Sequence, residues 1–207
     1  MNKYLKLGKV GIAMPVALTG FLGFYMASPV LEWNALLCTT GIFFLAMASG
    51  SLNQIQERHT DALMKRTSDR PLPSGEINLT QAILATVSLI LSGTALLMLT
   101  GHLLAPLLGI FTLLWYNLVY TPLKRITAFA VLPGALIGAL PPLIGWTAAG
   151  ENPLDMEILA VAFLLFVGQM PHYWLLLIKV GDEFHKAGLP VITSLFDQRQ
   201  IRNLSFI

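Results

Sequence analysis

The segment ALLCTTGIFFLAMASGSLNQI (residues 35–55) is a long apolar stretch that leads directly into the highly charged QERHTDALMKRTSDR (residues 56–70). A helix of about 20 mostly apolar residues is long enough to cross the ~30 Å hydrocarbon core of a membrane. Further apolar stretches of similar length lie near residues 10–30, 79–100, 103–121, 128–149 and 157–178. The sequence therefore predicts an all-α, polytopic bundle of transmembrane helices with six spans.

The composition also indicates a transmembrane protein. Of the 207 residues, 55% are hydrophobic and 12% are charged, whereas about 25% of the residues of a typical soluble domain are charged. The six spans take up more than half of the chain. We therefore expect a single transmembrane domain over residues 1–207 and no separate soluble domain.

The positive charges predict the orientation of the chain. All 13 Lys and Arg residues lie before the first span, between the second and third, between the fourth and fifth, or after the sixth. Loops rich in Lys and Arg stay on the cytoplasmic side, so we expect a bacterial-type inner (plasma) membrane protein with a cytoplasmic N-terminus. Because topology accounts for the basic residues, they indicate no nucleic-acid partner.

The charged segment after the second span carries candidate metal ligands. Asn53, Glu57 and Asp61 are spaced four residues apart, so they stack on one face if the helix continues to Asp61. Mg²⁺ prefers one or two carboxylates together with substrate phosphates. Arg66 and Arg70 follow four residues apart, and guanidinium groups bind phosphate oxygens in bidentate fashion. This pattern is typical of a metal–diphosphate site.

A solvated loop is the alternative interpretation of these charges. Pairs four residues apart, such as Asp61 and Lys65, could simply neutralise one another at the membrane surface. Charge spacing alone slightly favours this second interpretation.

Two further clusters lie on the same predicted side of the membrane. Tyr120 and Lys124 end the fourth span and offer a phenol and an ammonium group to one anion, although Pro122 lies between them. Asp182 and Glu183 close the sixth span and add two carboxylates. Together these clusters favour clamping of a diphosphate by metal ions, with Lys and Arg stabilising the leaving group.

The fifth and sixth spans contain unusual residues. Gly134 and Gly138 form a small-xxx-small pair that favours close helix packing, and Pro141-Pro142 could open a cavity. His172 is an ionisable residue within a span, which marks a candidate functional site. It could bind haem iron, move a proton, or form a hydrogen bond with a neighbouring helix.

These motifs together resemble those of a known superfamily. The string N-x-x-x-E-x-x-x-D-A-L-M-K-R-T-x-x-R-P-L-P-S-G, from Asn53 to Gly75, resembles the first signature of the UbiA-type intramembrane prenyltransferases. DALMKRT followed by RPL is similar to the protoheme IX farnesyltransferase (haem O synthase) branch. GALPPLIGW (residues 138–146), QMPHYW (169–174) and AGLP (187–190) extend the resemblance over nearly the whole chain.

The resemblance implies an activity: Mg²⁺-dependent transfer of the farnesyl group of farnesyl diphosphate to a vinyl group of haem B, giving haem O for terminal oxidases. The lipid bilayer surrounds such an enzyme, and haem A synthase or a second copy of the chain are the implied protein partners. The resemblance also implies nine helices. With six spans present, we expect a domain that is truncated at its C-terminus.

The resemblance assigns roles to individual residues. It implies that the metal ligands are Asn53, Glu57, Asp61, Asp182 and Glu183, and that Arg66, Arg70 and Lys124 bind the diphosphate. Tyr120 would line the site, and His172 becomes a candidate for contact with haem. Glu57 departs from the superfamily pattern, in which Asp is commonest, and the longer side chain changes the metal geometry.

Two other functions stay open at this point. The same diphosphate site could serve another aromatic or tetrapyrrole acceptor. Alternatively, the chain could be a non-catalytic, shortened membrane protein that binds haem or assists assembly.

Overall fold

The computed structural model describes residues 2–186, 188, 190 and 196–206, and at 177, 179–186, 198 and 204–206 it describes the backbone alone. Over this range all regular elements are helical. They are α1 (Lys3–Leu7), α2 (Val10–Ala27), α3 (Trp33–Ala62), α4 (Leu79–Met98), α5 (Leu104–Leu114), the π-helix η1 (Trp115–Tyr120), α6 (Thr121–Leu123), the 3₁₀ helix η2 (Ala128–Ala130), α7 (Val131–Ala148), α8 (Met156–Lys186) and α9 (Gln198–Phe206). The predicted all-α class is confirmed.

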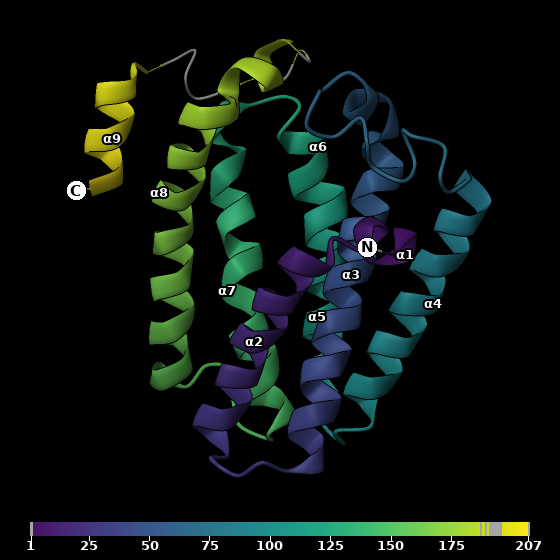
Figure 1. Cartoon of the computed structure of the whole chain (residues 1–207). Coiled ribbons are helices and arrows are strands. Elements are labelled where there is room, and N and C mark those ends of the chain that lie inside the picture. Colours follow the sequence, from purple (N-terminus) through teal and green to yellow (C-terminus); the bar gives the residue numbers. More distant parts are fainter. Residues whose placement is uncertain (1, 187, 189, 191–195, 207) are drawn as a thin grey trace.

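Six helical segments of the described chain are long and apolar enough to cross a membrane. They are Val10–Ala27, Trp33–Ala62, Leu79–Met98, Leu104–Leu123, Ala128–Ala148 and Met156–Leu176, which confirms the six predicted spans. They form one bundle, with the C-terminal ends of α3 and α8 and the short α6 at one end and the turns α2–α3, α4–α5 and α7–α8 at the other (Figure 1). Large apolar side chains such as Leu84 and Phe163 are exposed on its outer surface, as lipid contact requires. The chain is an integral, multi-pass membrane protein.

Helix α3 forms the centre of the bundle. It packs against α2, α4, α5 and α7, and its residues Ala35, Cys38, Ile42, Leu45 and Ala48 belong to the main buried apolar cluster. The helix continues without interruption from this apolar span to Ala62. The apolar core and the polar residues that follow it are therefore parts of one rigid element.

Helices α2 and α7 meet backbone to backbone below the middle of the bundle. A Cβ atom on Gly23 would collide with the backbone of Pro142, and one on Gly145 would collide with the carbonyl oxygen of Gly20. The two prolines lie inside α7. Small residues permit such close approach in membranes, where packing rather than the hydrophobic effect drives association of helices.

The predicted close packing at Gly134 and Gly138 involves side chains instead. A Cβ on Gly134 would lie 2.8 Å from the ring of Tyr120, and one on Gly138 would lie 3.2 Å from the side-chain oxygen of Gln169. These glycines make room for two large side chains, whereas Gly145 provides the close contact between helices.

Gly23→Ala is expected to destabilise the bundle by about 3 kcal/mol, because the new methyl group meets rigid backbone and α2 must move away from α7. Thermal unfolding in detergent measures the effect. The matched control is Gly168→Ala, because a Cβ at that position in α8 would meet nothing within 4 Å. Equal unfolding temperatures for the two variants would contradict this account of the α2–α7 contact.

Candidate functional site

The last turns of α3 carry three buried polar side chains on one face. Asn53, Glu57 and Asp61 are 1%, 6% and 1% exposed, and the amide nitrogen of Asn53 donates to Oε2 of Glu57 at 2.9 Å. All three line one cavity, which we call the charged chamber; its other lining residues are Lys9, Thr60, Met64, Arg66, Arg70, Tyr116 and Lys124. The four-residue spacing thus corresponds to a shared cavity.

Basic residues from two loops pair with these carboxylates. Arg70 Nη1 lies 2.5 Å from Oδ2 of Asp61, and Lys124 Nζ lies 2.8 Å from Oε2 of Glu57. The loop that carries Arg70 folds back over the end of α3, where Thr67 Oγ1 donates to the carbonyl oxygen of Asp61 at 2.8 Å. Because Asp61 is buried and paired with Arg70, the alternative of a solvated loop with an Asp61–Lys65 pair is wrong.

The fourth span reaches the chamber through a π-helical segment. Pro122 does not interrupt it, since η1 leads directly into α6. Tyr116 lines the chamber, although the sequence predicted Tyr120. The ammonium nitrogen of Lys124 lies over the Tyr120 ring, 5.6 Å from its centroid. π-Helical turns occur frequently at functional sites, but no local sequence signal distinguishes Tyr116 from Tyr120.

Lys9 is the second chamber residue that sequence analysis missed. It joins α1 to α2 with φ 51° and ψ 51°, in the left-handed region that non-glycine residues seldom occupy. Its ammonium group donates to Oδ1 of Asn53. The carbonyl groups of Lys6 and Leu7 each accept a hydrogen bond of 2.9 Å from Nε2 of Gln54, which fixes α1 against α3. Backbone strain of this kind is concentrated at functional sites.

The surroundings of Lys9 disfavour its charge. Burial first, and then the neighbouring charges of Arg70 and Lys124, lower the pKa of Lys9 from 10.5 to about 7, although Glu57 and Asp61 act in the opposite direction. An anion bound in the chamber would raise the pKa of Lys9 again, because it adds negative charge beside Lys9, Arg70 and Lys124.

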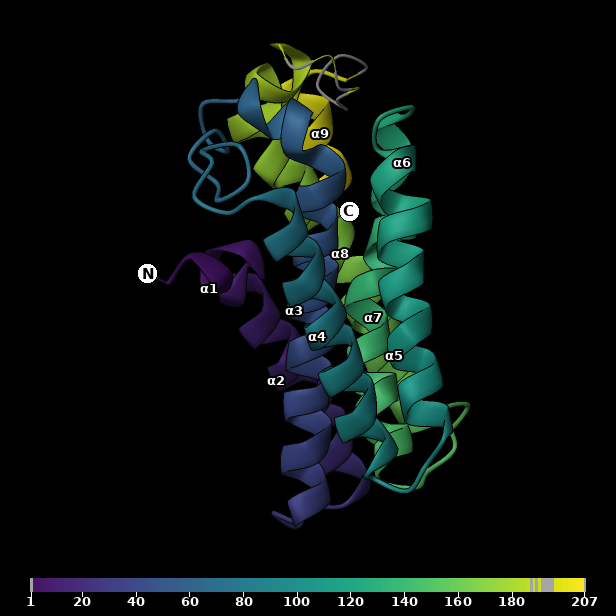
Figure 2. The ribbon, with the colours of Figure 1, turned by 90° about the vertical axis from the view of Figure 1, so that its right-hand side faces the viewer.

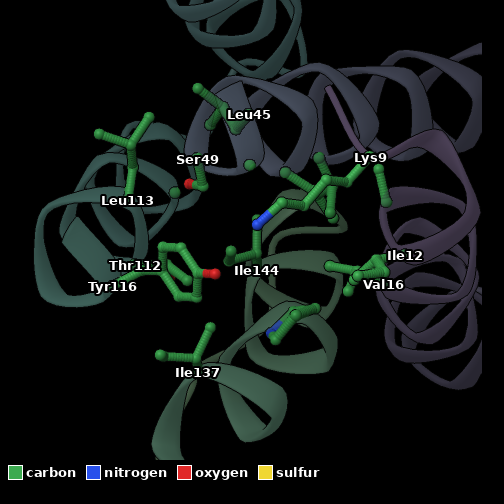
Figure 3. A pocket seen from close by; sticks show the side chains of 16 residues that line it. Lys9, Ile12, Val16, Leu45, Ser49, Thr112, Leu113, Tyr116, Ile137 and Ile144 are labelled. Carbon is green, nitrogen blue, oxygen red and sulfur yellow. The ribbon is translucent and has the colours of Figure 1, made fainter. Parts of the chain in front are cut away.

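A second, apolar cavity adjoins the charged chamber. Four helices line it: Lys9, Ile12, Ala13 and Val16 from α2 and its start, Ile42, Leu45, Ala46, Ser49 and Gly50 from α3, Gly109, Thr112, Leu113 and Tyr116 from α5 and η1, and Ile137, Pro141 and Ile144 from α7. In Figure 3 the ammonium group of Lys9 and the hydroxyl group of Tyr116 point toward its centre. Because Lys9 and Tyr116 line both cavities, the two lie directly next to each other.

The remaining predicted site residues lie in α8. His172 is exposed on this helix. Asp182 and Glu183 belong to the helical backbone of α8, but their side chains lie outside the described residues. Figure 2 shows the C-terminal end of α8 and the end of α3 at the same end of the bundle.

The donor set of the chamber suits a hard cation that is completed by phosphate. Within the described part of the chain, no three His, Cys, Asp or Glu side chains form a ready metal cage. Glu57 and Asp61 nevertheless provide two buried carboxylates beside the amide of Asn53. This matches Mg²⁺, which keeps several waters and takes few protein ligands when phosphates are present.

Comparison with known proteins agrees with these observations. The UbiA prenyltransferase family matches residues 13–207. The chain belongs to this family. Its resemblance to the UbiA prenyltransferases is therefore confirmed.

Several curated relatives within the UbiA family share one name. The protoheme IX farnesyltransferase of Geobacter sulfurreducens is 45% identical over 162 residues, which cover 78% of this chain and 58% of the relative. That of Nitratidesulfovibrio vulgaris strain Hildenborough is 38% identical over 194 residues, which cover 93% and 68%. That of Cytophaga hutchinsonii is 36% identical and covers 91% and 66%. The chain thus spans 58–68% of the length of these relatives.

Solved structures of UbiA proteins share the fold. A UbiA homologue from Archaeoglobus fulgidus bound to GPP and Mg²⁺ superposes with a TM-score of 0.77 at 20% identity, covering 99% of this chain and 73% of that chain. A digeranylgeranylglyceryl phosphate synthase gives a TM-score of 0.78 at 18% identity, covering 98% and 71%. The UbiA-like architecture predicted from the sequence is confirmed.

Proposed function

We propose that this chain transfers the farnesyl group of farnesyl diphosphate to a vinyl group of haem B, giving haem O. One observation carries the proposal: an apolar cavity lies directly beside a chamber of paired acidic and basic side chains, and Lys9 and Tyr116 line both. A prenyl diphosphate has the same two parts, an apolar chain and a dense negative charge. The names of the relatives supply the haem acceptor.

Asn53, Glu57 and Asp61 would hold Mg²⁺ on the diphosphate, and Mg²⁺ would neutralise its negative charge. Arg70 and Lys124 are already paired with the same carboxylates. When the metal–diphosphate unit binds, each carboxylate–cation pair would be replaced by a carboxylate–metal and a cation–phosphate contact. No buried charge is then left without a partner, which matters because such a charge costs several kcal/mol.

The basic side chains then stabilise the departing diphosphate. As the bond between the first prenyl carbon and oxygen breaks, negative charge accumulates on the oxygen. Lys9, Arg66, Arg70 and Lys124 line the chamber and would surround this position. Cations that are held in place before the reaction stabilise developing charge without reorganisation. Tyr120 would contribute by holding Lys124 through the contact between its ring and the ammonium group.

The apolar walls protect the resulting allylic cation from premature attack by water. The vinyl group of haem forms the new carbon–carbon bond, and the cation left on the porphyrin side takes up water and loses a proton, giving a hydroxyethylfarnesyl side chain. Haem would approach from α8, where exposed His172 is the proposed contact. Asp182 and Glu183 are proposed as a second acidic cluster.

The predicted orientation completes the proposal. The N-terminus and the charged chamber would face the cytoplasm, because the basic residues of the charged chamber and of the loops lie at one end of the bundle. Haem B, farnesyl diphosphate and the bilayer are the proposed partners. Haem A synthase, or a second copy of this chain, is a further proposed partner.

The test is an assay in membranes that contain the chain, with haem B, farnesyl diphosphate and Mg²⁺. Haem O is the expected product, identified by chromatography and mass, and chelation of Mg²⁺ with EDTA is expected to abolish it. A prenylated quinone precursor in a parallel reaction would instead favour another acceptor. Haem binding without turnover, seen as a shifted Soret band, would favour a non-catalytic protein.

A further inference from the structure

The apolar cavity extends along four helices, away from the charged chamber. Starting from the end next to the charged chamber, its lining residues run from 9 to 16 on the α2 side and from 137 to 144 on α7. On the helices that run the other way, they extend from 50 to 42 on α3 and from 116 to 109 on η1 and α5. The lining residues of each helix thus span seven or eight steps along the chain, which corresponds to a depth of about 10–12 Å at ~1.5 Å per step.

Two isoleucines form the floor of the cavity. Ile42 and Ile144 are the deepest lining residues of α3 and α7, and each is 3% exposed. Directly below them, α2 and α7 cross backbone to backbone at Gly20 and Gly145, and the tip of Ile42 fills the space beside Gly20. The helix backbones below the two isoleucines cannot move apart without breaking this contact, so only the side chains set the depth of the cavity.

The depth sets a limit on the prenyl chain. An extended chain gains about 1.2 Å per bond, so each prenyl unit of four main-chain bonds adds about 5 Å. Three units need about 14 Å, which the cavity accommodates when the first carbons lie at its mouth beside Lys9. A fourth unit, at about 19 Å, would collide with the floor.

We propose, on the basis of the proposed function, that Ile42 and Ile144 determine prenyl chain length by closing the cavity below a farnesyl group. Val16, the last lining residue along α2, would complete the floor from the third side. The site would therefore select farnesyl over geranylgeranyl diphosphate by exclusion, and over geranyl diphosphate by filling the space.

Two variants should shift this selectivity in opposite directions. Ile144→Ala lowers the floor, and we expect the affinity for geranylgeranyl relative to farnesyl diphosphate to rise about tenfold or more. Val16→Phe makes the cavity shallower, and we expect the affinity for geranyl relative to farnesyl diphosphate to increase by a similar factor. Ile83→Ala on the outer surface of α4, where Ile83 is 45% exposed, is the matched control and should change neither ratio.

Binding of the three diphosphates, each with Mg²⁺, is measured by isothermal titration in detergent, and farnesyl transfer to haem B is measured in parallel. If the ratios of affinities shift as expected in both variants, the proposed role of these residues in limiting chain length is supported. Unchanged ratios, or wild-type protein that binds geranylgeranyl as tightly as farnesyl diphosphate, would overturn it. If the protein binds the diphosphates according to chain length but transfers no farnesyl group to haem B, the proposed acceptor is wrong. The proposed limit on chain length would then still hold. Should Ile144→Ala fail to fold, Val16→Phe decides, since it adds rather than removes packing volume.

Discussion

Replacing Asp61 by Asn is expected to lower the turnover number for farnesyl transfer by roughly 10³-fold. The change removes one of two buried carboxylates beside Asn53 and also the partner of Arg70. Both the proposed Mg²⁺ and the guanidinium group would lose their position relative to the diphosphate. The measurement is haem O formation in membranes at saturating farnesyl diphosphate, with the amount of inserted protein determined separately.

Asp69→Asn is the matched control for this prediction. Asp69 lies in the same loop, carries the same charge and is exposed, so its replacement should leave turnover within about twofold of wild type, as for most surface substitutions. Comparable losses in the two variants would indicate a general effect of loop charge. Turnover above a tenth of wild type in Asp61→Asn would reject the proposed metal site.

Replacing Lys9 by Met is expected to lower kcat/KM for farnesyl diphosphate by about 10²-fold, because a preorganised donor beside the departing oxygen is lost. Met keeps the length and apolar character of the side chain, so the packing of the α1–α2 junction should be retained. Haem O formation is measured over a range of farnesyl diphosphate concentrations.

Lys3→Met is the matched control, which distinguishes a role of Lys9 in the site from an effect of its charge on the orientation of the chain in the membrane. Lys3 belongs to the same N-terminal segment but reaches outward, toward the carbonyl oxygen of Glu76 and the ring of Tyr4. Both variants remove one positive charge from the segment, so an effect on orientation would appear equally in both. We expect activity loss only in Lys9→Met, and equal loss would remove Lys9 from the site.

The local pattern of the sequence was sufficient to predict part of the site. Asn53, Glu57 and Asp61 share one helical face because a helix repeats every 3.6 residues, and this periodicity needs no knowledge of distant parts of the chain. The spacing could not reveal the partner of each charge. Asp61 lies four residues from Lys65 in sequence but pairs with Arg70, because the loop after α3 turns back over the helix end.

The roles of Lys9 and Tyr116 depend on how separate helices pack. Lys9 contacts Asn53 across 44 residues of sequence, and Lys124 contacts Glu57 across 67. Such contacts depend on the angle and spacing of whole helices. Here the glycine contacts between α2 and α7 and the π-helical turn of η1 set that geometry.

The sequence by itself determined the membrane class, the six spans and the helical face of α3. Inside a bilayer, backbone polar groups must be satisfied within each helix, so hydrophobic length alone identifies a span. Only the tertiary structure decided which side chains meet in the charged chamber, that Tyr116 and Lys9 line it, and where the apolar cavity ends. Those features arise from packing between helices, and packing depends on the shapes of surfaces that the linear order of residues does not display.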